Sequence, residues 1–309
     1  EEAVTTDGRK VDIWGNIGSP NDVDAVIESG ATGIGLYRTE FLFMNSDHFP
    51  TEEEQYQAYR VVAEKMKGKP VTIRTMDIGG DKELPYLDLP KELNPFLGYR
   101  AIRISLENKD MFKTQLRAIL RASQYGQIKI MYPMISSINE IRKANAILEE
   151  CKKELDEIGK IYDRNIKVGI MVETPSTAII AYKFAKEVDF FSIGTNDLTQ
   201  YFLAVDRGNE MVSTLYNSFN PAVLEAIQKV IDAAHDANIN VSMCGEFAGD
   251  KKATKLLLGM GLDSFSMSAS SGLQVKKIIR NSSYTDAQKY RDLVLQQNTP
   301  EEVLEHLLP

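Results

Sequence analysis

This sequence has few cysteines and no long apolar run. It has only two cysteines, Cys151 and Cys244. Two cysteines cannot form a disulfide framework, so a reducing compartment is the simpler expectation. No apolar run reaches the roughly 18 residues that span a bilayer, and no signal-peptide pattern opens the chain. We therefore expect a cytoplasmic protein that does not insert into a membrane.

An excess of positive charge is missing as well. The formal net charge is -8 at pH 7, and such a chain does not attract nucleic acid or an anionic membrane through its average field. We therefore expect no nucleic-acid partner. An anionic metabolite could still bind, but only where arginines are gathered locally.

What the sequence does contain is a regular alternation of short apolar runs with longer amphipathic stretches. About eight runs have the length and composition of buried strands. They are Val11–Ile17, Gly33–Tyr37, Pro70–Met76, Ile128–Met134, Lys167–Val172, Asp189–Gly194, Asn240–Cys244 and Ser264–Met267. Eight strands separated by helices predict an α/β fold, the (β/α)8 TIM barrel. A doubly wound open sheet is the rival architecture, although no Gly-rich dinucleotide fingerprint follows the first run.

Two of these runs end in arginine. Arg38 follows the second run and Arg74 lies near the end of the third. In a barrel the C-terminal ends of the strands meet on one face, so the two guanidinium groups would point at one spot and could hold a phosphate or carboxylate. The alternative is that each arginine closes a salt bridge with Glu40 or Asp77.

The fifth and sixth runs, which are neighbours, are followed by carboxylates, Glu173 and Asp197. Two carboxylates together with water and substrate oxygens make a typical Mg²⁺ site. Asp197 could instead cap the helix that is expected to begin near Leu198, but capping would not explain Glu173.

Cys244 ends the seventh run, beside a glycine. Its thiol could act as nucleophile, as general acid, or simply as a packed apolar group. Cys151 lies within an expected helix and is predicted to be inert. The three histidines, His48, His235 and His306, all lie outside strand ends, so we expect no histidine nucleophile or metal ligand in this chain.

Several long motifs, in order, resemble one family, the PEP-utilising enzymes. Gly33–Met44, Ser192–Tyr201 and Cys244–Asp250 resemble the family as a whole. Within it, the enzyme I branch of the bacterial sugar phosphotransferase system is most similar, and the resemblance covers essentially the whole chain. The motifs that favour this branch are Thr72–Lys82, Asn94–Arg100 and Gly169–Ser176.

The resemblance implies a role for each candidate residue. Phosphoenolpyruvate (PEP) would be held by four residues, with Arg100 nearby, and Mg²⁺ by two. Cys244 would donate a proton to the enolate carbon as pyruvate forms. The PEP-binding residues would be Arg38, Arg74, Asn196 and Arg207, and the metal ligands Glu173 and Asp197.

The resemblance also implies the organisation of the enzyme. We expect residues 1–10 to be the remainder of an interdomain linker, and 11–309 to be the PEP-binding and homodimerisation domain. No segment resembles the N-terminal phosphohistidine domain, which would supply the acceptor histidine and pass the phosphate to the carrier HPr for sugar uptake. Two alternatives stay open: a domain of the pyruvate phosphate dikinase or PEP synthase type, and a non-catalytic dimerising PEP sensor.

Overall fold

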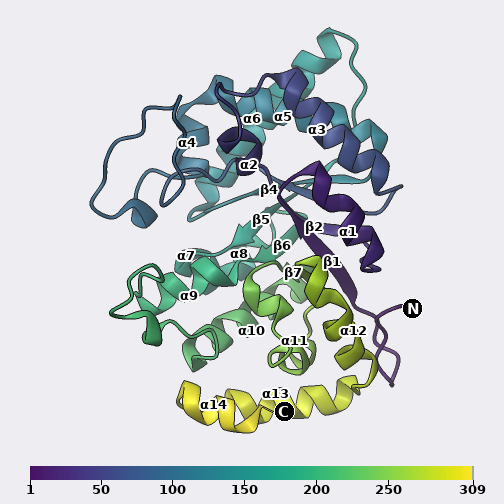
Figure 1. Ribbon diagram of the computed structural model, residues 1–309, viewed down its shortest axis with the longest axis vertical. Helices are drawn as coiled ribbons and strands as arrows, with labels where there is room; N and C mark the ends of the chain where they lie inside the picture. Colours follow the sequence, from purple (N-terminus) through teal and green to yellow (C-terminus); the bar gives the residue numbers. More distant parts are fainter. Residues whose placement is uncertain (308–309) are drawn as a thin grey trace.

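The computed structural model describes residues 1–307 and shows a closed barrel of parallel strands with helices around it (Figure 1). The strands follow one another in chain order, and β8 pairs with β1. They are β1 (Asp12–Ile17), β2 (Ile34–Arg38), β3 (Val71–Arg74), β4 (Ile128–Tyr132), β5 (Lys167–Val172), β6 (Phe190–Ile193), β7 (Asn240–Met243) and β8 (Ser264–Met267). The predicted (β/α)8 TIM barrel is therefore confirmed, and the open doubly wound sheet is excluded because the first and last strands pair.

Helices connect and cover the strands. They are α1 (Val23–Glu28), α2 (Glu40–Met44), α3 (Glu52–Lys65), α4 (Ile102–Glu107), α5 (Lys109–Ala122), α6 (Ile138–Glu157), α7 (Pro175–Ile179), α8 (Ala181–Phe184), α9 (Thr195–Leu203), α10 (Pro221–Asp236), α11 (Thr254–Met260), α12 (Gly272–Arg280), α13 (Tyr284–Leu295) and α14 (Pro300–His306). Short 3-10 turns include η2 (Pro95–Leu97) and η5 (Glu246–Gly249). Within residues 1–307, none of the helices is both long and apolar enough to cross a bilayer.

Two parts of the core lie on opposite sides of the barrel wall because the side chains of a strand alternate between its two faces. In β4, Ile130 belongs to the large cluster between the barrel and the helices. Its neighbour Met131 belongs to a separate buried cluster together with Leu36, Met171, Phe190 and Cys244. Three members of that second cluster, Leu36, Met171 and Cys244, also line the cavity at the strand ends, so an apolar floor supports the polar groups above it.

The long connection between β3 and α4 is buried in its first part. Met76, Ile78 and Leu84 form a small buried cluster with Phe43 and Ile104. The Ala101 N–H donates to the Ile78 carbonyl at 2.8 Å and closes the base of the connection. The return of this segment over the strand ends is what brings Lys82 and Arg100 into the cavity.

The segment 1–10, expected to be a linker, packs against the barrel. Val4 and Lys10 form an antiparallel bridge. The Asp7 carboxylate accepts hydrogen bonds from the backbone N–H groups of Tyr284 and Thr285 at 2.8 and 3.0 Å. Asp7 therefore ties the N-terminal segment to the beginning of α13. Residues 308–309 of the expected domain lie outside the described residues.

Candidate functional site

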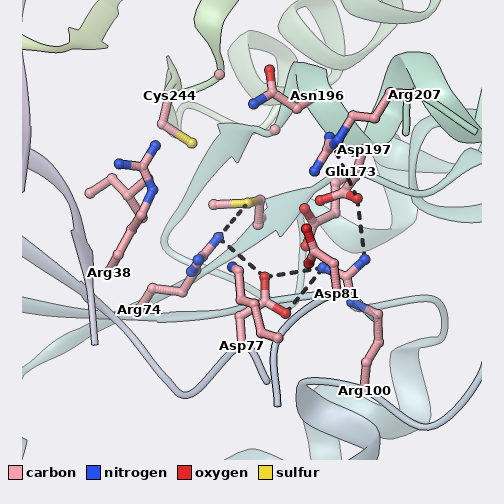
Figure 2. Close-up of a pocket in the computed structure, with 15 residues that line it drawn as sticks. Arg38, Arg74, Asp77, Asp81, Arg100, Glu173, Asn196, Asp197, Arg207 and Cys244 are labelled. Atoms are coloured by element: carbon pink, nitrogen blue, oxygen red, sulfur yellow. Dashed lines mark hydrogen bonds and ion pairs between the residues drawn. The ribbon is translucent and has the colours of Figure 1, made fainter. Parts of the chain in front are cut away.

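Two arginines stand side by side at the C-terminal edge of the barrel. Arg38 is the last residue of β2, Arg74 is the last residue of β3, and the two are register partners. Both line a cavity of about 120 Å³. Figure 2 shows Arg38 and Cys244 at one end of this cavity and Arg100, Glu173 and Asp197 at the other. The geometry expected from the sequence is present.

The two arginines differ in their partners. Arg74 is buried, with Nη2 at 2.6 Å from Glu40 Oε1 and Nη1 at 3.4 Å from Asp77 Oδ2. Arg38 makes no hydrogen bond or ion pair within the described chain. Burial, reinforced by the charge of Arg74, lowers the pKa of Arg38. The salt-bridge alternative thus holds for Arg74 and is wrong for Arg38, whose donors are free for an anionic ligand.

Glu173 directly follows β5 and is almost completely buried, at 1% exposure. Its Oε1 atom accepts a hydrogen bond from the Met134 N–H at 2.6 Å. Met134 has a φ of 55°, a conformation that is uncommon outside glycine. Burial, together with the nearby carboxylates of Asp197 and Asp77, raises the pKa of Glu173 well above its ordinary value. A cation beside Glu173 would reverse that effect.

Asp197 does not cap the helix that contains it. The N-cap of α9 is Gly194, and Asp197 lies in the first turn with its side chain turned into the cavity. Its Oδ1 atom accepts a hydrogen bond from Arg100 Nη1 at 3.2 Å and lies 3.9 Å from Arg207 Nη1. The capping alternative is therefore wrong, since this carboxylate faces cations rather than backbone N–H groups.

Arg100 joins two carboxylates that are far apart in the sequence. Its Nη2 atom donates to both oxygens of Asp77 at 3.1 and 3.2 Å, while Nη1 donates to Asp197. Burial opposes the ionisation of Asp77, but the charges of Arg100 and Arg74 outweigh it and hold the pKa of Asp77 below its ordinary range. Arg100 was expected near the substrate. It lines the cavity as expected, and its guanidinium group is bound to carboxylates.

Asn196 and Arg207 complete the expected set on the side of α9. The Asn196 Oδ1 atom accepts from the Glu246 N–H at 3.1 Å, so the amide nitrogen remains for another partner. Arg207 Nη1 is buried without a hydrogen bond. A Cβ atom on Gly245 would lie only 2.0 Å from Thr195 Oγ1. Glycine therefore lets the end of β7 approach the beginning of α9.

Cys244 follows β7 and is 3% exposed, yet it lines the cavity. Its carbonyl accepts from Asn16 Nδ2 at 2.9 Å, which fixes the backbone, and its Sγ lies 3.8 Å from the Ile193 carbonyl oxygen. Burial raises the pKa of the Cys244 thiol. A protonated thiol is suited to donating a proton and is a poor nucleophile. Cys151, in contrast, is buried in α6 away from the cavity, as expected.

All eight residues expected to act together line the same cavity. They are Arg38, Arg74, Arg100, Glu173, Asn196, Asp197, Arg207 and Cys244. Asp81 and Lys82 also line the cavity but were not predicted from the sequence, although both belong to the Thr72–Lys82 motif. Lys82 Nζ lies 3.0 Å from Glu40 Oε1, so Glu40 forms ion pairs with both Lys82 and Arg74. The glycines that precede Asp81, which allow a tight turn, were the available signal.

The carboxylates fit a divalent cation in number and chemistry. No hydrogen bond within the described chain reaches Glu173 Oε2 or Asp197 Oδ2. Among residues 1–307 no group of three or more His, Cys, Asp or Glu side chains is arranged to hold a metal. Two free carboxylate oxygens suit a hard ion such as Mg²⁺, which usually keeps several waters and substrate oxygens among its ligands.

Comparison with known proteins finds relatives that are more than half identical to this chain. A phosphoenolpyruvate-protein phosphotransferase of Haemophilus influenzae is 59% identical over 301 residues, which is 97% of this chain and 52% of that protein. The protein of the same name from Bacillus subtilis is 57% identical over 304 residues, or 98% and 53% of the two chains. The chain thus spans about half the length of these curated relatives.

The barrel fold also occurs in a distant solved structure. A citrate lyase of Burkholderia xenovorans LB400 matches with a TM-score of 0.53 at 13% identity, covering 99% of this chain and 93% of that one. This likeness concerns the fold alone. Residues 1–284 match the family described as PEP-utilising enzyme, PEP-binding domain. The chain therefore belongs to the PEP-utilising enzymes and carries their PEP-binding domain.

Proposed function

We propose that this chain binds PEP together with Mg²⁺ in the cavity at the strand ends. Within a longer enzyme, it would then release the phosphoryl group to a histidine of an N-terminal domain. One observation carries the proposal: four guanidinium groups, two carboxylates with free oxygens and a buried thiol line one small cavity. The relatives named phosphoenolpyruvate-protein phosphotransferase support this reading over the dikinase or synthase type.

PEP would be held by charge-assisted hydrogen bonds. Arg38 offers donors that no side chain of the described chain uses, and Arg207 has a buried Nη1 without a hydrogen bond. Arg74 has a buried Nε without a partner, and the amide nitrogen of Asn196 is also available. Hydrogen bonds to charged groups contribute about 1.5–3 kcal/mol each, so these donors together would hold a trianion firmly.

Glu173 and Asp197 would hold the Mg²⁺ ion through their free oxygens. When bound, the ion would offset negative charge on the substrate as the phosphoryl group leaves. The residues of the chain would contribute orientation and fixed charge. The buried ion pair between Arg74 and Glu40 keeps one guanidinium in place before substrate arrives, which avoids reorganisation during the transfer.

The thiol of Cys244 would complete the reaction. Breaking the bond between phosphorus and the enol oxygen leaves the enolate of pyruvate, while the phosphoryl group goes to the histidine nitrogen. The methylene carbon of the enolate then takes the proton from Cys244 Sγ, and the thiolate recovers a proton from water. Burial keeps the thiol protonated until that step because it raises the pKa.

Isothermal titration of this chain with PEP, with and without Mg²⁺, tests the proposal. We expect binding that depends on the metal. We also expect no appreciable consumption of PEP until a phosphohistidine domain is added, and with that domain and HPr present, pyruvate should form. Failure of PEP to bind in either condition, or consumption of PEP by the chain alone, would contradict the proposal.

We also propose that the chain forms a homodimer in the cytoplasm. Leu93 and Leu97, on the connection between β3 and α4, are 98% and 65% exposed. They line one cavity with Ala204 and Val205, which follow α9. An exposed apolar surface built from two loops favours a protein contact. Sedimentation of the wild type and of Leu97→Asp tests this, and a wild type that is monomeric at all concentrations would exclude it.

A further inference from the structure

Arg100 stands where positive charge is needed before any metal ion arrives. It is 4% exposed and contacts Asp77 and Asp197 at distances of 3.1 to 3.2 Å. Glu173, another buried carboxylate, faces the same space. Three carboxylates cannot share such a space as anions without nearby cations. Arg74 reaches Asp77 but makes no contact with Asp197.

The guanidinium group of Arg100 binds Asp77 through more hydrogen bonds than it binds Asp197. Nη2 holds Asp77 through two hydrogen bonds, whereas Nη1 makes one bond to Asp197 and one of 3.3 Å to Tyr201 Oη. Releasing Asp197 would therefore leave Nη1 with a hydrogen-bond partner and leave the pair with Asp77 intact. Arg100 would stay in place as the positive charge beside Asp197 is replaced.

The backbone supports this position. The residue after Arg100, Ala101, has a φ of 50°, which a residue with a side chain adopts rarely and at a cost. The Ala101 N–H is held by the Ile78 carbonyl at 2.8 Å. The chain is thus held in an uncommon conformation at the point where it delivers Arg100 to the carboxylates.

We propose that Arg100 is a positioning residue that acts as the resident counter-ion of the metal site, and that it yields Asp197 to the divalent cation when the cation binds. This inference rests on the proposed function and adds to it a reason why metal binding depends on substrate. The guanidinium group already neutralises Asp197 and repels a cation beside it, so the cation binds weakly alone. PEP supplies negative charge and further ligands, so in its presence the cation replaces Arg100 as the partner of Asp197.

Binding of Mn²⁺ without PEP, followed by electron paramagnetic resonance of the free ion, tests the proposal. Replacing Arg100 with glutamine removes the competing charge, so Arg100→Gln should bind Mn²⁺ at least tenfold more tightly than the wild type. Adding Asp197→Asn to that variant should abolish the gain. Arg103→Gln is the matched control, because Arg103 donates to the carbonyls of Leu97 and Gly98 and to no carboxylate. It should bind Mn²⁺ as the wild type does.

A second variant keeps the test decisive if Arg100→Gln unfolds. Arg100→Lys retains a positive charge for Asp77 but has no second arm for Asp197, and it should bind Mn²⁺ severalfold more tightly than the wild type. Metal affinity that is unchanged or weaker in a folded Arg100 variant would overturn the proposal. Because PEP is absent, this outcome is separate from failure of the proposed function, which would appear as a wild type that does not bind PEP.

Discussion

Replacing Arg74 with lysine separates the fork of the guanidinium group from its charge. Arg74 holds Glu40 at 2.6 Å through one nitrogen and Asp77 at 3.4 Å through another, and its buried Nε has no partner. A lysine ammonium can keep the pair with Glu40, but it cannot also reach Asp77 and a substrate oxygen. We therefore expect the variant to fold and to bind PEP more weakly.

The size of the loss follows from one charge-assisted hydrogen bond. Such a bond contributes about 1.5–3 kcal/mol, and about 1.4 kcal/mol corresponds to tenfold in affinity. Arg74→Lys should therefore weaken PEP binding roughly 10- to 100-fold in the presence of Mg²⁺. Isothermal titration measures this directly, and thermal unfolding of the same sample shows whether the barrel is intact.

Arg117→Lys is a suitable control for the effect of replacing an ion-paired arginine with lysine. Arg117 also bridges two carboxylates, Glu52 at 3.1 Å and Glu154 at 2.8 Å, but it lies outside the cavity. Its variant should bind PEP as the wild type does. If Arg74→Lys also binds PEP with unchanged affinity, Arg74 serves the structure alone and the proposed binding role is refuted.

Three further predictions concern the metal, the thiol and a surface histidine. Glu173→Gln should remove the Mg²⁺ dependence of PEP binding in the titration, and a dependence that persists would exclude Glu173 as a ligand. Because burial raises the pKa of the Cys244 thiol, pyruvate formation with the N-terminal domain added should hold through neutral pH and fall only in alkali as the thiol ionises. Cys244→Ala should bind PEP but form little pyruvate, and equal activity would remove the thiol from the mechanism. The hydrogen bond that His235 donates to Asp263 raises the pKa of His235, so the stability it adds is complete below the ordinary pKa and is lost as pH rises through the raised one. His235→Gln should accordingly lower the unfolding temperature more at pH 5.5 than at pH 9, and an equal loss at both would refute this.

The sequence alone determined the parallel α/β architecture and most of the candidate site, and it favoured the barrel over the open sheet that only the pairing of β1 with β8 excluded. Apolar runs of strand length recur between amphipathic segments, and only a parallel sheet covered by helices buries them all. Barrel closure then brings the C-terminal ends of all strands together. Residues such as Arg38, Glu173 and Cys244 could therefore be placed on one face from their position in the chain, before any coordinates were known.

Only the tertiary structure decided how these charges pair. Whether Asp197 caps α9 or binds an arginine depends on Arg100, which lies 97 residues away in the sequence. The connection between β3 and α4 brings Arg100 there by folding back over the strand ends. Likewise, Arg38 is free while Arg74 is paired because Glu40 and Asp77 both reach the second arginine. Strong ion pairs form only between groups that lie within a few ångströms of each other. The packing of the loops decides which groups come that close, and the periodicity of the sequence does not.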